Sequence, residues 1–111
     1  AILDAGQFGL PISSSVTNKL TQLAEEVCLA VRKAIPLSHP DHDDLAFLYG
    51  AILTDGKDAF GDTPTRNICV FADSQVDRSP TGSGVSARLA IQHHLRAARG
   101  CHRLGQGVGP L

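Results

Sequence analysis

The sequence has no tryptophan and no methionine, and it has only four phenylalanines and one tyrosine among 111 residues. Aliphatic side chains must therefore fill any hydrophobic core. Hydrophobic residues make up 42% of the chain and charged residues 19%, which is typical of a globular protein and not of a disordered one. The length favours one domain, because domains most often contain about 100–150 residues.

Other features are missing as well. Lysine and arginine form no cluster that would neutralise phosphates, and the formal net charge is −1, so a nucleic-acid partner is not expected. No apolar run approaches the ~20 residues of a membrane-spanning helix, and the first residues show no signal peptide. We therefore expect a cytoplasmic protein with neither a nucleic-acid nor a membrane partner.

The three cysteines, Cys28, Cys69 and Cys101, form no CxxC pair, and their number is odd. A disulfide framework or a structural zinc site is therefore not expected, and reduced thiols fit an intracellular protein. We interpret Cys28 and Cys69, which fall in a predicted helix and a predicted strand, as small buried apolar residues. Cys101 falls in a glycine-rich segment and is interpreted as an exposed free thiol without a catalytic setting.

The most regular pattern runs from Val16 to Ala34, where apolar residues recur every three or four positions. This spacing predicts one buried face of an α-helix. The serines at positions 13–15 are suitable caps for its start, and Pro36 ends it. Upstream, residues 1–11 can hold a short strand, although two glycines and a proline interrupt them.

Two apolar segments predict buried strands. Leu45–Leu53 is apolar on both faces, and Gly50 within it indicates a bulge or a close approach of backbone. Asn67–Ala72 predicts a second, shorter strand. Between them, the dipeptide Asp55-Gly56 predicts a turn.

The helical spacing returns after a connecting loop, Asp73–Thr81. It predicts a helix that opens at Gly82–Gly84 and extends to Leu95. The order of helix, strand, strand and helix predicts a mixed α/β (α+β) fold. Residues 1–99 are expected to form the folded part, and the glycine-rich segment 100–111 is expected to be a loose tail.

The most informative segment is 77–88, DRSPTGSGVSAR. Pro80 restricts the backbone, whereas Gly82 and Gly84 let backbone N–H groups face a ligand without obstruction by side chains. The free N–H groups and the partial positive charge of the helix that begins here suit a carboxylate or a phosphate. Asp77 adds a negative charge, so the segment offers both charges that an amino-acid zwitterion requires.

Simpler interpretations stay open, because Thr81 or Ser83 would also serve as an ordinary helix N-cap. Positions 82–87 match the dinucleotide pattern G-x-G-x-x-A, but about nine residues separate them from the strand and no acid follows ~20 positions later. A P-loop needs G-K-S/T, which the sequence lacks. The segment 38–44, SHPDHDD, matches no structural zinc spacing and is interpreted as a solvated loop.

The segment DRSPTGSG resembles the second active-site motif of the proline racemase family, which reads DRSPCGTG and carries one of two catalytic cysteines. The resemblance extends through DLAFLYGAILTDGKDA and NICVFADSQVDRSP and covers the chain from Gln22 to His94. Thr81 stands at the cysteine position, an exchange that marks the branch of the family that dehydrates trans-3-hydroxy-L-proline. The resemblance implies a hydro-lyase without metal or organic cofactor, with a small-molecule substrate, that works as a homodimer.

The family resemblance also implies a fold like that of diaminopimelate epimerase, with the active site between two similar α/β lobes. Thr81 is implied to face the base that removes the Cα proton and to assist departure of the hydroxyl group. Asp77 is implied to pair with the ring nitrogen. Backbone N–H groups of Gly82 and Ser83 are implied to hold the carboxylate, and Phe71 is implied to form an apolar wall.

The chain departs from the family pattern in two places. The family's base is a cysteine in a first-lobe motif with adjacent glycine and histidine, and no cysteine here has that setting. Residues 96–111 also lack the strands that follow this helix in the family. We therefore expect one incomplete lobe with the threonine-containing half of the active site. The alternatives are a proline or hydroxyproline racemase or epimerase of the same family, and a non-catalytic fragment or isoform.

Overall fold

The computed structural model describes the backbone of residues 1–57 and 64–105, and the side chains of these residues as far as Ala97. The chain forms two compact units, Ala1–Thr81 and Gly82–Leu111. The first unit contains a four-stranded sheet and a long helix, and the second contains a helix. The predicted mixed α/β class is therefore confirmed.

The sheet of the first unit consists of β1 (Ile2–Asp4), β2 (Gly50–Thr54), β3 (Asn67–Phe71) and β4 (Gln75–Val76), in that spatial order. β1 runs parallel to β2, whereas β2 with β3 and β3 with β4 are antiparallel. Ile52 in the centre of β2 pairs with Ile2 on one side and with Cys69 on the other. The short strand that residues 1–11 can hold is thus an edge strand of this sheet.

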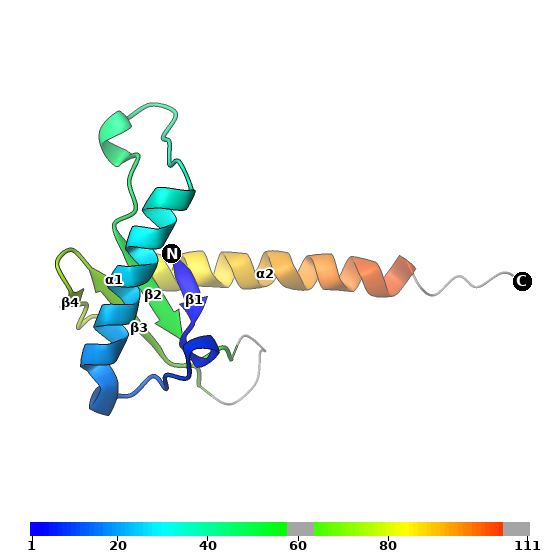
Figure 1. Cartoon of the computed structure of the whole chain (residues 1–111). Coiled ribbons are helices and arrows are strands. Elements are labelled where there is room, and N and C mark those ends of the chain that lie inside the picture. The colour runs from blue at the N-terminus through cyan, green and yellow to red at the C-terminus, as the bar shows by residue number, and fades with distance from the viewer. Residues whose placement is uncertain (58–63, 106–111) are drawn as a thin grey trace, which may run out of the picture. The chain divides into compact units, whose positions relative to one another are not determined.

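Helix α1 (Thr17–Ala34) packs across one face of the sheet (Figure 1). The predicted helix from Val16 to Ala34 is confirmed, and the 3-10 turns η1 (Ala5–Phe8) and η2 (Ser14–Val16) precede it. Side chains from α1 and from the facing side of the sheet form the hydrophobic core. The buried core residues are Ala5, Leu20, Leu23, Ala24, Cys28, Ala51, Leu53 and Val70.

The opposite face of the sheet carries a different set of side chains. Successive residues of a strand point to opposite faces. Cys69 and Phe71 therefore share the face opposite to that of the buried Val70. Ile52, the cross-strand partner of Cys69, lies on this second face with them, and all three are half-buried.

The predicted strand Leu45–Leu53 begins too early. The 3-10 turn η3 (Asp43–Leu45) comes first, and β2 starts only at Gly50. Arg32 accounts for part of the difference, because its Nε and Nη2 both donate to the Leu48 carbonyl oxygen, at 3.3 and 2.7 Å. That carbonyl therefore bonds a side chain of α1 instead of a neighbouring strand.

Strand β4 lies inside the segment Asp73–Thr81, for which the sequence predicts a loop. It follows β3 through a tight turn in which residues 72–74 have φ values of 25, 48 and 63°. The Ser74 hydroxyl forms a hydrogen bond with Glu25 of α1, which ties the turn to the helix. Glycine usually marks such positive φ values, and its absence here leaves the hairpin without a sequence signal.

Helix α2 (Gly82–Gly105) begins where the sequence predicts a helix but ends later. It continues past Leu95 and past Gly100, where a loose tail was expected, because alanine and arginine at positions 96–99 favour the helical conformation. Residues 106–111, the remainder of that tail, lie outside the described residues. Within the described ranges, no helix is both long and apolar enough to cross a membrane.

At Gly50 the backbone of β3 lies very close to that of β2, which is the close approach that the sequence predicts. A Cβ atom there would lie 2.4 Å from the Val70 carbonyl oxygen and 3.0 Å from Phe71 Cα. These are backbone atoms of the paired strand, so Gly50→Ala should lower the free energy of unfolding by about 1–3 kcal/mol, as overpacking does. Urea denaturation measures this change.

Gly82→Ala is the matched control, because a Cβ at Gly82 meets no atom within 4 Å. Equal stability of the two variants would contradict the close approach at Gly50.

Candidate active site

The segment after β4 folds back on the Asp77 carboxylate. The Thr81 hydroxyl donates to Asp77 Oδ2 at 2.7 Å, and the Ser79 N–H donates to Asp77 Oδ1 at 2.8 Å. The Thr81 N–H in turn donates to Ser79 Oγ at 3.1 Å. Led by the bond from Thr81, these contacts hold the pKa of the Asp77 carboxyl below its usual value. Asp77 and Thr81, both predicted site residues, are thus brought together around one negative charge.

Thr81 has an unusual backbone conformation for its residue type. Its φ is 53°, in the left-handed region that β-branched residues rarely adopt. Strain of this kind persists only where surrounding contacts fix it, and it clusters at functional sites. The hydrogen bonds to Asp77 and Ser79 supply those contacts. Thr81 is therefore held in one orientation, with its single hydroxyl proton directed at Asp77.

Cys69 contacts the same cluster from β3. The Asp77 N–H donates to the Cys69 carbonyl oxygen at 2.9 Å. Burial raises the pKa of the Cys69 thiol; the side chain of Thr81 opposes this rise, and the charge of Asp77 adds to it. Cys28 is buried in the core, as predicted, whereas Cys69 is only half-buried. The side chain of Cys101 lies outside the described residues.

The sequence does not reveal the contact between Cys69 and Asp77, because this contact depends on the strand register. Val70 pairs with Val76 in the hairpin of β3 and β4, and this pairing sets Cys69 opposite Asp77. This contact could have been predicted if the hairpin had been, but the turn contains no glycine that would indicate a hairpin in the sequence.

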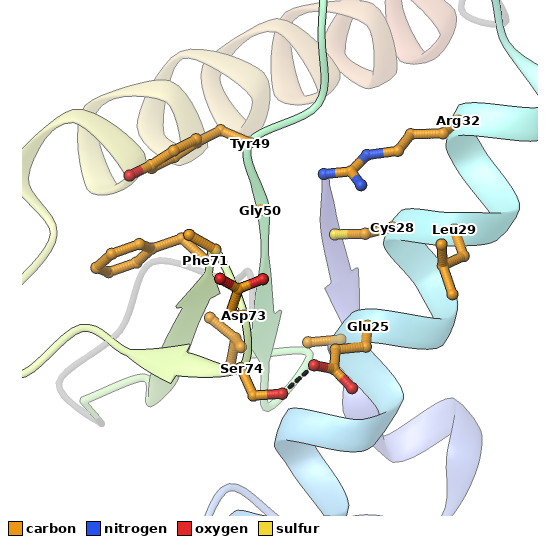
Figure 2. A pocket seen from close by; sticks show the side chains of 12 residues that line it. Glu25, Cys28, Leu29, Arg32, Tyr49, Gly50, Phe71, Asp73 and Ser74 are labelled. Atoms are coloured by element: carbon orange, nitrogen blue, oxygen red, sulfur yellow. Dashed lines mark hydrogen bonds between the residues drawn. The ribbon is translucent and has the colours of Figure 1, made fainter.

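Phe71 follows Cys69 by two residues and lies on the same sheet face, about 7 Å further along the strand. Its ring stacks on that of Tyr49, with the centroids 5.5 Å apart and the planes at 15°. Figure 2 shows both rings directed away from α1. The predicted wall residue Phe71 therefore shares a sheet face with Cys69, and Tyr49 extends the aromatic surface.

A separate cavity of about 390 Å³ lies between α1, the start of β2 and the turn after β3. Cys28 and Arg32 point into it from α1, and Asp73 borders it on the other side (Figure 2). The residues that line it do not include Asp77 or Thr81. The cavity is therefore distinct from the hydrogen-bonded segment.

Gly82 and Ser83 follow Thr81 directly and are the first two residues of α2. The first N–H groups of a helix have no partner within the helix, so the backbone here has donors to offer. Their binding of a carboxylate stays a prediction.

The segment SHPDHDD is a loop as far as His42, as predicted, and its last two residues begin the 3-10 turn η3. His39 Nδ1 accepts from the N–H groups of Asp41 and His42, at 3.3 and 3.1 Å, and the rings of His39 and His42 lie 5.6 Å apart. Among the described residues, no group of three or more His, Cys, Asp or Glu is placed to hold a metal ion.

Comparison with known proteins places these features in one family. A family model described as proline racemase matches residues 1–107. Trans-L-3-hydroxyproline dehydratase of Xenopus tropicalis is 57% identical over 94 residues, and trans-3-hydroxy-L-proline dehydratase of Homo sapiens is 58% identical over 94 residues. Trans-3-hydroxy-L-proline dehydratase of Colwellia psychrerythraea is 39% identical over 93 residues.

The matches cover most of this chain but a small part of each relative. The animal proteins align with 85% of the chain, which spans 27% of their length, and the bacterial protein aligns with 84%, which spans 26%. The family model covers the sheet, the segment from Asp77 to Thr81 and nearly all of α2. The chain therefore belongs to the proline racemase family.

Proposed function

We propose that the protein to which this chain belongs is a cofactor-independent hydro-lyase that converts trans-3-hydroxy-L-proline to pyrroline-2-carboxylate and water. The observation that carries the proposal is Thr81 in DRSPTGSG, at the position where the racemases of the family have a catalytic cysteine. Relatives that are 53–58% identical to the chain are named as dehydratases of this substrate, which supports it.

The chemistry of residue 81 decides between the two reactions of the family. Racemisation requires a base on each face of the ring, and a hydroxyl group is far too weakly acidic to become a second base. Dehydration requires only one base, together with help for the departing hydroxyl group. Thr81, with its oriented proton, suits this second role.

The proposed reaction begins when a first-lobe cysteine, outside this chain, takes the Cα proton. The electron pair of the Cα–H bond forms a double bond to C3 while the C3–O bond breaks. The departing hydroxyl group, hydrogen-bonded by Thr81, takes up a proton from solvent and leaves as water, and the cysteine then releases the Cα proton to solvent. A proton shift in the remaining enamine gives pyrroline-2-carboxylate.

The other predicted residues bind and orient the substrate in this proposal. Asp77, whose lowered pKa keeps it ionised near neutral pH, pairs with the ring ammonium. Backbone N–H groups of Gly82 and Ser83 hold the carboxylate and stabilise the charge that develops on it. Phe71 provides an apolar wall for the ring carbons, which its place on the face of Cys69 supports.

The proposal extends to the architecture of the whole protein. Residues 1–99 would be part of one lobe of a diaminopimelate epimerase-like fold, with 100–111 as a tail, and the complete enzyme would be a cytoplasmic homodimer with its site between two lobes. Two observations support an incomplete lobe: α1 covers one face of a mixed sheet, and the chain spans only 27% of the length of the Xenopus tropicalis relative. A non-catalytic role for the chain by itself is the second candidate, favoured by the lack of a first-lobe cysteine motif.

A product assay separates these candidates. The 111-residue chain and a full-length protein that contains it are each incubated with trans-3-hydroxy-L-proline, and pyrroline-2-carboxylate is measured, with proline racemisation assayed in parallel. Dehydration by the full-length protein alone is expected, because the chain has half of the site. Racemisation without dehydration would refute the proposed function, and turnover by the chain alone would refute the external base.

Substitution of Thr81 tests its role in the full-length protein. Thr81→Val removes the hydroxyl group and should reduce kcat for dehydration about 10²–10⁴-fold, the range for loss of a proton-donating group. Thr81→Ser, the matched control, should retain most of the activity. Thr81→Cys should gain measurable proline racemisation, and a well-folded variant without any would contradict the placement of residue 81 opposite the base.

The Asp77–Thr81 hydrogen bond predicts a change that can be measured without turnover. Because this bond is the main cause of the lowered pKa of Asp77, Thr81→Val should raise that pKa toward the usual value of an aspartate. Carboxyl NMR titration of the chain measures it, and Asp55, bonded to Thr65 and Arg66 instead, is the internal control. If the pKa of Asp77 is the same in Thr81→Val as in the unmodified chain, the hydrogen bond does not form in solution.

A further inference from the structure

Tyr49 packs against a residue of the candidate site, yet the proposed reaction gives it no role. Its ring stacks on that of Phe71, the proposed apolar wall, with the centroids 5.5 Å apart and the planes at 15°. Both rings point away from α1 (Figure 2). The side chain of Tyr49 is 58% exposed, so burial in the core does not account for its placement.

The backbone on both sides of Tyr49 is fixed by residues of other elements. Before it, the Leu48 carbonyl oxygen accepts from Nε and Nη2 of Arg32, at 3.3 and 2.7 Å. After it, Gly50 pairs with Phe71 across β2 and β3, and the missing side chain of Gly50 lets the two backbones approach. Because residues 48 and 50 are both held, the ring of Tyr49 is directed onto Phe71 and is not a freely placed surface side chain.

The stack restricts the ring of Phe71. The second side-chain torsion of a phenylalanine is broad, so a ring at a half-buried position can change its plane. A second ring packed nearly parallel to it removes part of that freedom, and such pairs stabilise beyond the area that they bury. A wall whose plane is already set binds a substrate with a smaller loss of conformational entropy.

We propose that Tyr49 is a positioning residue that holds the ring of Phe71 in place as the apolar wall for the ring carbons of the substrate, an inference that rests on the proposed dehydratase function. Tyr49 acts through Phe71 and touches none of the bonds that break. It therefore affects the bound substrate and the transition state equally, which changes KM and leaves kcat as it is. An aromatic ring is sufficient for this task, so the hydroxyl group of Tyr49 is dispensable.

Dehydration kinetics of the full-length protein test this role. Tyr49→Leu should raise KM about 2–10-fold, the equivalent of one aromatic pair, with kcat unchanged. Tyr49→Phe keeps the ring and should retain the KM of the unmodified protein. Phe47→Leu is the matched control, because it removes an exposed ring that meets Tyr49 edge-on, at 6.0 Å and 77°, and leaves the stack in place.

A double variant shows whether Tyr49 acts through Phe71. Phe71→Leu removes the wall itself and should raise KM at least as much as Tyr49→Leu does. In that background Tyr49→Leu should have little further effect, because no ring is left to position. Independent effects of the two substitutions on KM would overturn the positioning role. So would an unchanged KM in Tyr49→Leu, a loss that Tyr49→Phe does not restore, or an equal loss in Phe47→Leu.

A measurement without turnover separates this inference from the proposed function. In urea denaturation of the 111-residue chain, Tyr49→Leu should lower the midpoint less in the Phe71→Leu background than in the unmodified chain. Additive shifts would show that the stack does not form in solution and would overturn the inference, whatever the kinetics show. If the unmodified full-length protein performs no dehydration, the proposed function fails separately, and the urea measurements still decide whether Tyr49 holds Phe71.

Discussion

Strand β3 is paired on both of its sides, with β2 through five residue pairs and with β4 through two. The pairing with β2 directs Val70 into the core and Cys69 to the opposite face. The pairing with β4 brings Asp77 beside Cys69. A slip of one residue would exchange the two faces of β3 and bury the wrong set of side chains. The burial of Val70 against α1 therefore also fixes the geometry of the candidate site.

Thr81 shows how local strain and hydrogen bonding are combined at this site. A β-branched residue with φ of 53° carries a cost on the order of 1–3 kcal/mol. The carboxylate of Asp77 and the hydroxyl of Ser79 offset it by bonding the side chain and the N–H group of Thr81. A glycine would relieve the strain but would have no hydroxyl group. The strain is thus the consequence of placing this side chain at this point of the backbone.

The elements that sequence reasoning located correctly, α1, β3 and the start of α2, are those with a strong local pattern. The start of β2 depends on the bond between Arg32 and the Leu48 carbonyl, which joins residues far apart in the chain. In the site, Asp77 and Thr81 belong to one short motif and were predicted together. Cys69 lies beside Asp77 through the hairpin of β3 and β4, and a strand pairing without a turn signal leaves no trace in composition or spacing.

The carboxylate beside residue 81 has opposite consequences for a hydroxyl group and for a thiol. For Thr81 it is an acceptor that fixes the direction of the proton. A thiol in the same place would have its pKa raised by the negative charge of Asp77, and it would ionise readily only after a substrate ammonium had neutralised that charge. A hydroxyl donor needs no ionisation, so it tolerates the carboxylate in the free and the bound state. Under the proposed function, the same backbone thus supports dehydration when residue 81 is a hydroxyl donor and racemisation when it is a thiol that can ionise.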